Sequence, residues 1–189
     1  MKNFEKSSLG CADGAPAVPS KVMKPQTAAL LWLFVVMFLV GLDQLTKYWA
    51  CLYLKDQEPF VVLSHVLELS YLENRGMAFG MLQGKTVFLL LTCFVFFLLA
   101  LYLYIKIPKT SYYLPCMILD MLLFAGALGN FLDRFFRGYV VDFIYISLIH
   151  FPVFNLADIY VVCGGILVVF FVSLKYRGEH DFDFLKWKS

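Results

Sequence analysis

Charged residues are scarce in this chain. Only 16% of its 189 residues are charged and 61% are hydrophobic, whereas soluble domains carry about 25% charged residues. This balance excludes an ordinary soluble domain and predicts a protein built for lipid. The net charge is only +2 and no run of basic residues stands out, so we expect no nucleic acid partner.

Metal-binding and disulfide-forming patterns are also missing. The five cysteines are scattered, odd in number and without a CxxC spacing, which favours buried or reduced thiols over disulfides or a metal site. His65 and His150 are isolated from other metal-ligand residues. We therefore expect neither a metal nor another cofactor.

The chain does contain four long apolar stretches, and each is long enough to cross a bilayer as a helix of about 20 residues. The predicted spans cover residues 28–51, 86–105, 113–132 and 154–174. The length leaves room for one domain. We expect a flexible cytoplasmic tail (1–27), a membrane domain (28–174) and a cytoplasmic C-terminal tail (175–189). The predicted fold class is an all-α polytopic membrane protein.

The basic residues predict how the four spans are oriented. Ten of the sixteen lysines and arginines lie in the two tails or in the short link between the second and third spans. Since cytoplasmic segments are enriched in basic residues, both termini are expected in the cytoplasm. Residues 52–85 and 133–153 then form two loops on the outer side.

Both outer loops carry structural signals. Residues 66–73 partly alternate apolar and polar side chains, as a strand does, and Asn74-Arg75-Gly76 follows as a turn. We therefore expect a small β-like platform on the outer membrane surface. The second outer loop is rich in aromatic and β-branched residues, which predicts an interfacial segment.

Polar residues that are costly in hydrocarbon gather near the outer ends of separate spans. Asp43 lies 15 residues after Ala28, about 22 Å along a hydrocarbon core of roughly 30 Å. The others are Asn74 and Arg75 before the second span, Asn130, Asp133 and Arg134 at the end of the third, and Asn155 and Asp158 at the start of the fourth. This convergence predicts one polar site at the outer interface.

Asp142 and Asp158 lie beside the ends of two apolar segments. If they meet at one depth, they can share a proton, so that one serves as general acid and the other as general base. The helix N-terminus favours an ionised Asp158, which leaves the proton on Asp142. Because a coupled pair titrates as a unit, the opposite assignment stays open.

Each polar residue also has a simpler explanation. Asp158 is well placed to cap the fourth span, and the i, i+4 pair Asp43 and Lys47 can neutralise itself. Gly126 and Gly129 allow close packing of helices.

Asp133 and Arg134 are compatible with ordinary interfacial charges. Asp120 lies nearer the inner side, where we expect it to be protonated or paired with a polar neighbour, without a functional role.

Two other functions are compatible with carboxylates in a membrane. One is a small proton- or ion-coupled carrier, although carriers usually have repeated halves and a site near the midplane. The other is a purely structural membrane subunit, which would not explain so many polar residues at one depth.

Five blocks, in this order and spacing, resemble bacterial lipoprotein signal peptidase, also called signal peptidase II. They are DQLTK (43–47), NRGMAFG (74–80), GALGNFLDR (126–134), GYVVDF (138–143) and FNLAD (154–158). The resemblance implies an aspartyl endopeptidase of the bacterial inner (cytoplasmic) membrane. Such enzymes remove signal peptides from prolipoproteins whose cysteine carries a diacylglyceryl group.

By position, the resemblance makes Asp142 and Asp158 the catalytic pair. Residues expected to support the site or bind substrate are Asp43, Lys47, Asn74, Gly126, Asn130, Asp133, Arg134 and Asn155. Expected partners are diacylglyceryl-modified prolipoproteins, membrane lipids and globomycin-type inhibitors. The chain departs from the family pattern at Met77, where a small alanine is more common, so the cleft near Asn74 is expected to be narrower or shaped for other residues.

Overall fold

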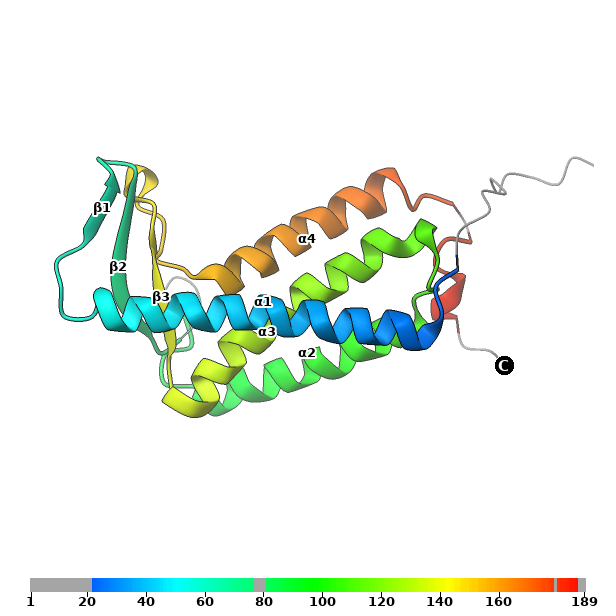
Figure 1. Ribbon diagram of the computed structural model, residues 1–189, viewed down its shortest axis with the longest axis horizontal. Helices are drawn as coiled ribbons and strands as arrows, with labels where there is room; N and C mark the ends of the chain where they lie inside the picture. The colour runs from blue at the N-terminus through cyan, green and yellow to red at the C-terminus, as the bar shows by residue number, and fades with distance from the viewer. Residues whose placement is uncertain (1–21, 77–80, 179, 187–189) are drawn as a thin grey trace, which may run out of the picture.

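The computed structural model describes residues 22–76, 81–178 and 180–186. Four long helices run side by side, and a small sheet stands across one end of them (Figure 1). Most of the tail expected at 1–27 lies outside the described residues, and so does Met77.

Each predicted span corresponds to one helix that is long and apolar enough to cross a membrane. The helices are α1 (Pro25–Tyr53), α2 (Thr86–Lys106), α3 (Leu114–Arg137) and α4 (Leu156–Leu174). The predicted fold class is therefore confirmed. Several boundaries differ from the predicted ones. The largest difference is at the end of α3, which continues past Leu132, so that Asp133 and Arg134 lie in the helix rather than in the following loop.

Local sequence explains where the helices begin and end. α1 and α3 each have a proline in the first turn, where the missing N–H costs nothing. α3 ends at Arg137 and is capped by Gly138, whose φ of +79° suits glycine best. α4 begins with a capping box formed by Asn155 and Asp158.

The sheet has three antiparallel strands in the order β1 (Phe60–Leu63), β2 (Leu67–Asn74), β3 (Val140–Tyr145). The strand predicted at 66–73 is confirmed as β2. The prediction missed β3 within the second outer loop, because its partner strand is distant in the sequence. Its pairing sets Leu72 opposite Asp142 and Asn74 opposite Val140, which brings the two outer loops together.

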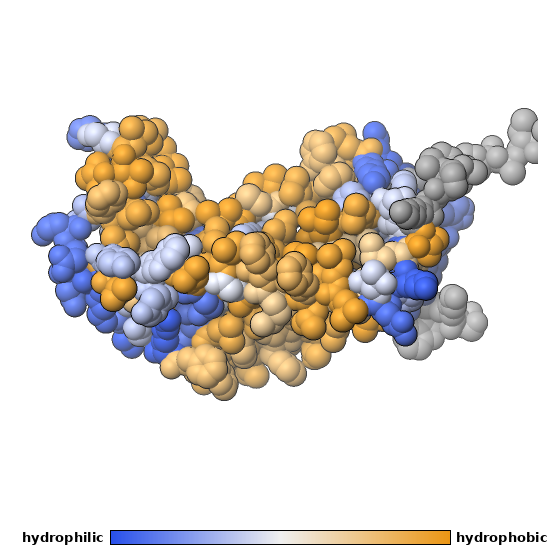
Figure 2. All heavy atoms as spheres, in the orientation of Figure 1, coloured by the Kyte–Doolittle hydropathy of each residue, from blue (hydrophilic) through white to orange (hydrophobic). Residues whose placement is uncertain are grey.

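α3 is the central helix, in contact with each of the other three. Its Met121 and Ala125 pack in a buried core with Val36, Val40 and Tyr160. The flanks of the bundle are largely apolar, whereas hydrophilic residues collect at its two ends (Figure 2). That distribution suits a bundle surrounded by lipid along its length.

Candidate functional site

Two carboxylates and three amides form a hydrogen-bonded group where the sheet meets the helices. Asn155 Nδ2 donates to Asp142 Oδ1 at 2.6 Å, and Asn74 Nδ2 donates to Asp142 Oδ2 at 2.9 Å. Asn130 Nδ2 donates to Asp158 Oδ1 at 2.7 Å. Asn155 Nδ2 also donates to Asn130 Oδ1 at 3.1 Å, which links the two halves. The structure thus unites β2, β3, α3 and α4 at one site.

Backbone donors fix the orientation of two of these amides. Asn74 Oδ1 accepts from the N–H of Gly76 at 2.9 Å, and Asn155 Oδ1 accepts from the N–H of Asp158 at 3.0 Å. With the oxygen engaged in this way, each NH₂ group points at Asp142. Hydrogen bonds of this kind hold a carboxylate in a defined rotamer.

Asp158 both caps α4 and faces the site. Its Oδ2 accepts from the backbone N–H of Asn155 at 3.2 Å, so the capping explanation is correct. Its Oδ1 accepts from Asn130. The N-terminus of α4 also favours negative charge on this side chain.

Asp142 is only 1% exposed. Burial raises the pKa of its carboxyl to about 6, the hydrogen bond from Asn74 opposes that rise, and the nearby charge of Asp158 adds to it. Because a buried anion is costly, Asp142 is suited to carry a proton under mildly acidic conditions.

Behind the carboxylate pair lies a buried ionic cluster. Lys47 Nζ is 2.9 Å from Asp43 Oδ2 and 3.1 Å from Asp133 Oδ2, and all three side chains are fully buried. The expected Asp43–Lys47 pair is therefore present. The pair is part of a larger cluster, because Lys47 also pairs with Asp133 of α3, whose Oδ1 lies 3.8 Å from Arg137 Nε.

An open groove of about 470 Å³ gives access to the carboxylates. Six of the site residues predicted from the sequence line this groove: Asn74, Gly126, Asn130, Arg134, Asp142 and Asp158. Arg134 donates to the carbonyl oxygens of Gly76 at 2.8 Å and of Asn130 at 3.3 Å. Asp43, Lys47, Asp133 and Asn155 are buried beside the groove rather than lining it.

Sequence reasoning missed the apolar walls of this groove. They include Thr92, Cys93 and Phe96 of α2 and Val161 and Val162 of α4. These residues resemble any lipid-facing position of an apolar helix. Their helical spacing puts them on one face, but the sequence does not tell which face turns toward the aspartates.

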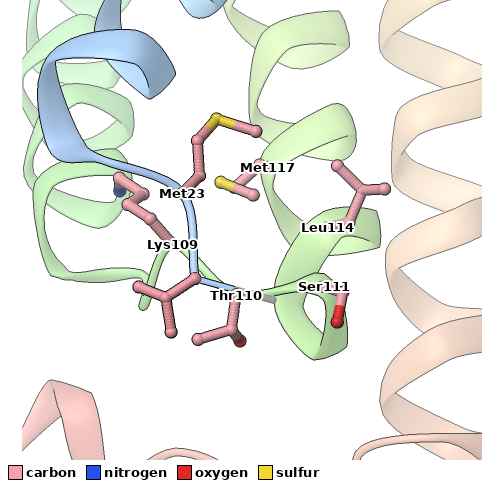
Figure 3. A pocket seen from close by; sticks show the side chains of 7 residues that line it. Met23, Lys109, Thr110, Ser111, Leu114 and Met117 are labelled. Carbon is pink, nitrogen blue, oxygen red and sulfur yellow. The ribbon is translucent and has the colours of Figure 1, made fainter. Parts of the chain in front are cut away.

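Asp120 accepts a hydrogen bond of 2.8 Å from Trp32 Nε1, so the expectation of a polar neighbour is confirmed. Near the same end of the bundle lies a second cavity, of about 260 Å³ (Figure 3). Met23, Leu114 and Met117 form much of its wall. No predicted site residue lines it, so the groove at the sheet end is the candidate site.

The chain is similar to known proteins over most of its length. A family model described as "Signal peptidase (SPase) II" matches residues 35–174. The lipoprotein signal peptidase of Caldanaerobacter subterraneus subsp. tengcongensis is 42% identical over 142 residues, covering 75% of this chain and 94% of that protein. The lipoprotein signal peptidase of Staphylococcus aureus (strain JH9) is 39% identical over 145 residues, covering 76% and 85%.

A solved structure described as a bacterial membrane enzyme has a similar fold. Its TM-score is 0.70 at 35% sequence identity, and the match covers 85% of this chain and 96% of that one. A second such structure has a TM-score of 0.65 at 38% identity, covering 80% and 94%. The similarity therefore spans the helices and the sheet together.

Proposed function

Since the chain belongs to the signal peptidase II family, it is an aspartic peptidase, and we propose that Asp142 and Asp158 are its catalytic pair. The observation that carries this proposal is their joint hydrogen bonding beside an open groove. Asn155 donates to Asp142 and to Asn130, which in turn donates to Asp158. Family membership also excludes a carrier or a purely structural subunit as the main function.

Cleavage follows from the environments of the two aspartates. Asp158, at the helix N-terminus, takes a proton from water as the water oxygen attacks the scissile carbonyl carbon. Asp142 gives its proton to the carbonyl oxygen, so a neutral tetrahedral intermediate forms. When this intermediate collapses, the C–N bond breaks, Asp158 gives its proton to the leaving nitrogen, and a hydroxyl of the intermediate returns its proton to Asp142 as the carbonyl re-forms. Each turnover thus consumes one water molecule and restores the shared proton.

The enzyme cleaves signal peptides from prolipoproteins. We infer that these substrates carry a diacylglyceryl group on the cysteine that follows the cleaved bond. Phe96, Val161 and Val162 give the groove apolar walls, which suit acyl chains. Anchoring in the bilayer would hold the bond at the depth of the aspartates and raise its effective concentration.

Other expected partners fit the same surfaces. Membrane lipids would contact the apolar flanks of the four helices. Globomycin-type cyclic peptides would occupy the groove in place of the substrate. We place the sheet on the outer side of the bacterial cytoplasmic membrane, with both termini in the cytoplasm, because of the distribution of basic residues.

Purified enzyme with a diacylglyceryl-modified precursor peptide tests the proposal. Asp142→Asn and Asp158→Asn should each lower turnover by more than about 1,000-fold, because an amide cannot exchange the proton. Glu68→Gln, on the sheet and away from the groove, should cleave normally. An unlipidated precursor should be cut far more slowly by the unaltered enzyme. Near-normal turnover of either aspartate variant would contradict the assignment, and equal rates for the two precursors would contradict the role of the lipid.

A further inference from the structure

Two buried aspartates hold the backbone directly next to the catalytic pair. Asp43 Oδ1 accepts from the N–H of Ala157 at 2.9 Å, and Ala157 immediately precedes Asp158. Asp133 Oδ2 accepts from the N–H of Val141 at 3.1 Å, and Val141 immediately precedes Asp142. The start of α4 and strand β3 are therefore held in the same manner.

One ammonium group joins these two contacts. Lys47 Nζ lies 2.9 Å from Asp43 Oδ2 and 3.1 Å from Asp133 Oδ2. It also donates to Asn130 Oδ1 at 2.9 Å. A lysine ammonium has three N–H donors, and here three oxygens surround it. The bond to Asn130 keeps that residue's NH₂ group pointed at Asp158.

We propose that Lys47 is the positioning residue of the catalytic pair: its ammonium fixes the separation of Asp142 and Asp158 through Asp43 and Asp133, and orients the Asn130 amide. This inference rests on the proposed function. Lys47 is fully buried and does not line the groove, so it acts through other residues.

Fold stability alone does not explain this arrangement. Taking one cation and two anions out of water is costly, and apolar replacements of buried ion pairs are often equally stable. The cluster joins α1 to α3 and, through two backbone N–H groups, to β3 and α4. The charge of Lys47 instead holds β3 and the start of α4, which bear the two catalytic aspartates, in a fixed relative position.

The charge of Lys47 also affects how readily Asp142 holds its proton. Lys47 lowers the pKa of Asp142, against the effects of burial and of Asp158. Removing it should raise the pKa of Asp142 and move the alkaline limb of the rate profile to higher pH. Besides Lys47, the titratable groups near Asp142 are Asp43 of α1, Cys93 of α2, Asp133 and Arg134 of α3, and Asp158 of α4.

Lys47→Met tests the proposal, because methionine has a similar shape and no charge. We expect kcat on the lipidated peptide to fall about 100-fold, as small misplacements of reacting groups do. KM should change less than about threefold, since Lys47 does not line the groove. The alkaline limb should move to higher pH. Lys55→Met, which removes an exposed lysine paired with Glu73, is the control and should behave like the unaltered enzyme.

A double variant addresses folding. Lys47→Met with Asp133→Asn keeps the net charge of the cluster, and the amide oxygen introduced by the second substitution can still accept from the N–H of Val141. The double variant should fold, with the same loss in kcat. A folded variant with normal kcat and an unmoved pH profile would overturn the positioning role. So would failure of both variants to fold, which would assign Lys47 to stability alone.

Asp142→Asn, measured in parallel, separates the two proposals. If that variant cleaves normally, the catalytic assignment itself is wrong. If it is inactive while folded Lys47→Met is normal, only the positioning role is wrong.

Discussion

Asp142 shows how burial favours the protonated form of a carboxyl group. It sits in β3 with both carboxylate oxygens engaged by amides, and it has almost no exposure to water. Burial raises the pKa of Asp142 to about 6, because a buried anion loses its hydration. The side chain expected to be the general acid is therefore the one whose surroundings favour the protonated form.

This environment predicts the direction of the pH dependence. As pH rises through the pKa of Asp142, the pair loses its shared proton and kcat/KM should fall about tenfold per pH unit. The midpoint of that limb should lie near pH 6 in the free enzyme. Initial rates at low substrate concentration, measured from about pH 4 to about pH 9, would test it. A rate that keeps increasing above pH 7 would contradict the assignment of Asp142 as the acid.

At the scale of elements, close approach of α3 to its neighbours makes the site possible. A Cβ added at Gly129 would collide with the Asp43 carboxylate, and one added at Gly126 would lie 2.7 Å from Val161 Cγ2. The packing explanation for these glycines is therefore confirmed. Because Gly129 has no side chain, the helices can pack closely there and Asp43 can take its place in the polar cluster.

Gly129→Ala should consequently disturb the site by changing how α3 packs against α1. The added methyl group would displace Asp43 and weaken its hold on the Ala157 N–H. We expect a loss of about 1–3 kcal/mol of stability, typical of overpacking, together with a large fall in kcat. Gly165→Ala on α4 is the control, since its Cβ would have no atom within 4 Å.

Thermal unfolding in detergent and cleavage of the lipidated peptide would be measured for both glycine variants. A Gly129→Ala enzyme as active and stable as Gly165→Ala would show that the contact with Asp43 is easily relieved.

The whole molecule places its sheet and its two described chain ends at opposite ends of the bundle (Figure 1). The apolar flanks between these ends fit a membrane-spanning orientation (Figure 2). In the orientation that we propose from the basic residues, the sheet lies outside and the termini lie inside. The polar site would thereby open where a substrate anchored in the outer leaflet can reach it.

Thiol labelling tests this orientation in intact cells. In a background where the five cysteines are replaced by serine, a membrane-impermeant maleimide should label Gln57→Cys, which lies on the sheet side. It should label Ser111→Cys, between α2 and α3, only after the cells are opened. The reverse pattern would turn the site toward the cytoplasm.

The sequence by itself determined the four spans, strand β2 and the single end of the bundle at which polar residues gather. It could do so because apolar length and period-two alternation are local properties. Asn155 and Asp158 were likewise predicted at the start of the fourth span, where they form a capping box.

Only the tertiary structure decided the rest. Strand β3 forms by pairing with a distant strand, and Leu72 lies opposite Asp142 because of that register. Lys47 forms ion pairs with both Asp133 and Asp43 because α1 and α3 pack side by side. These contacts join residues far apart in the chain, and the choice among possible partners depends on how whole helices and strands pack, which no local pattern encodes.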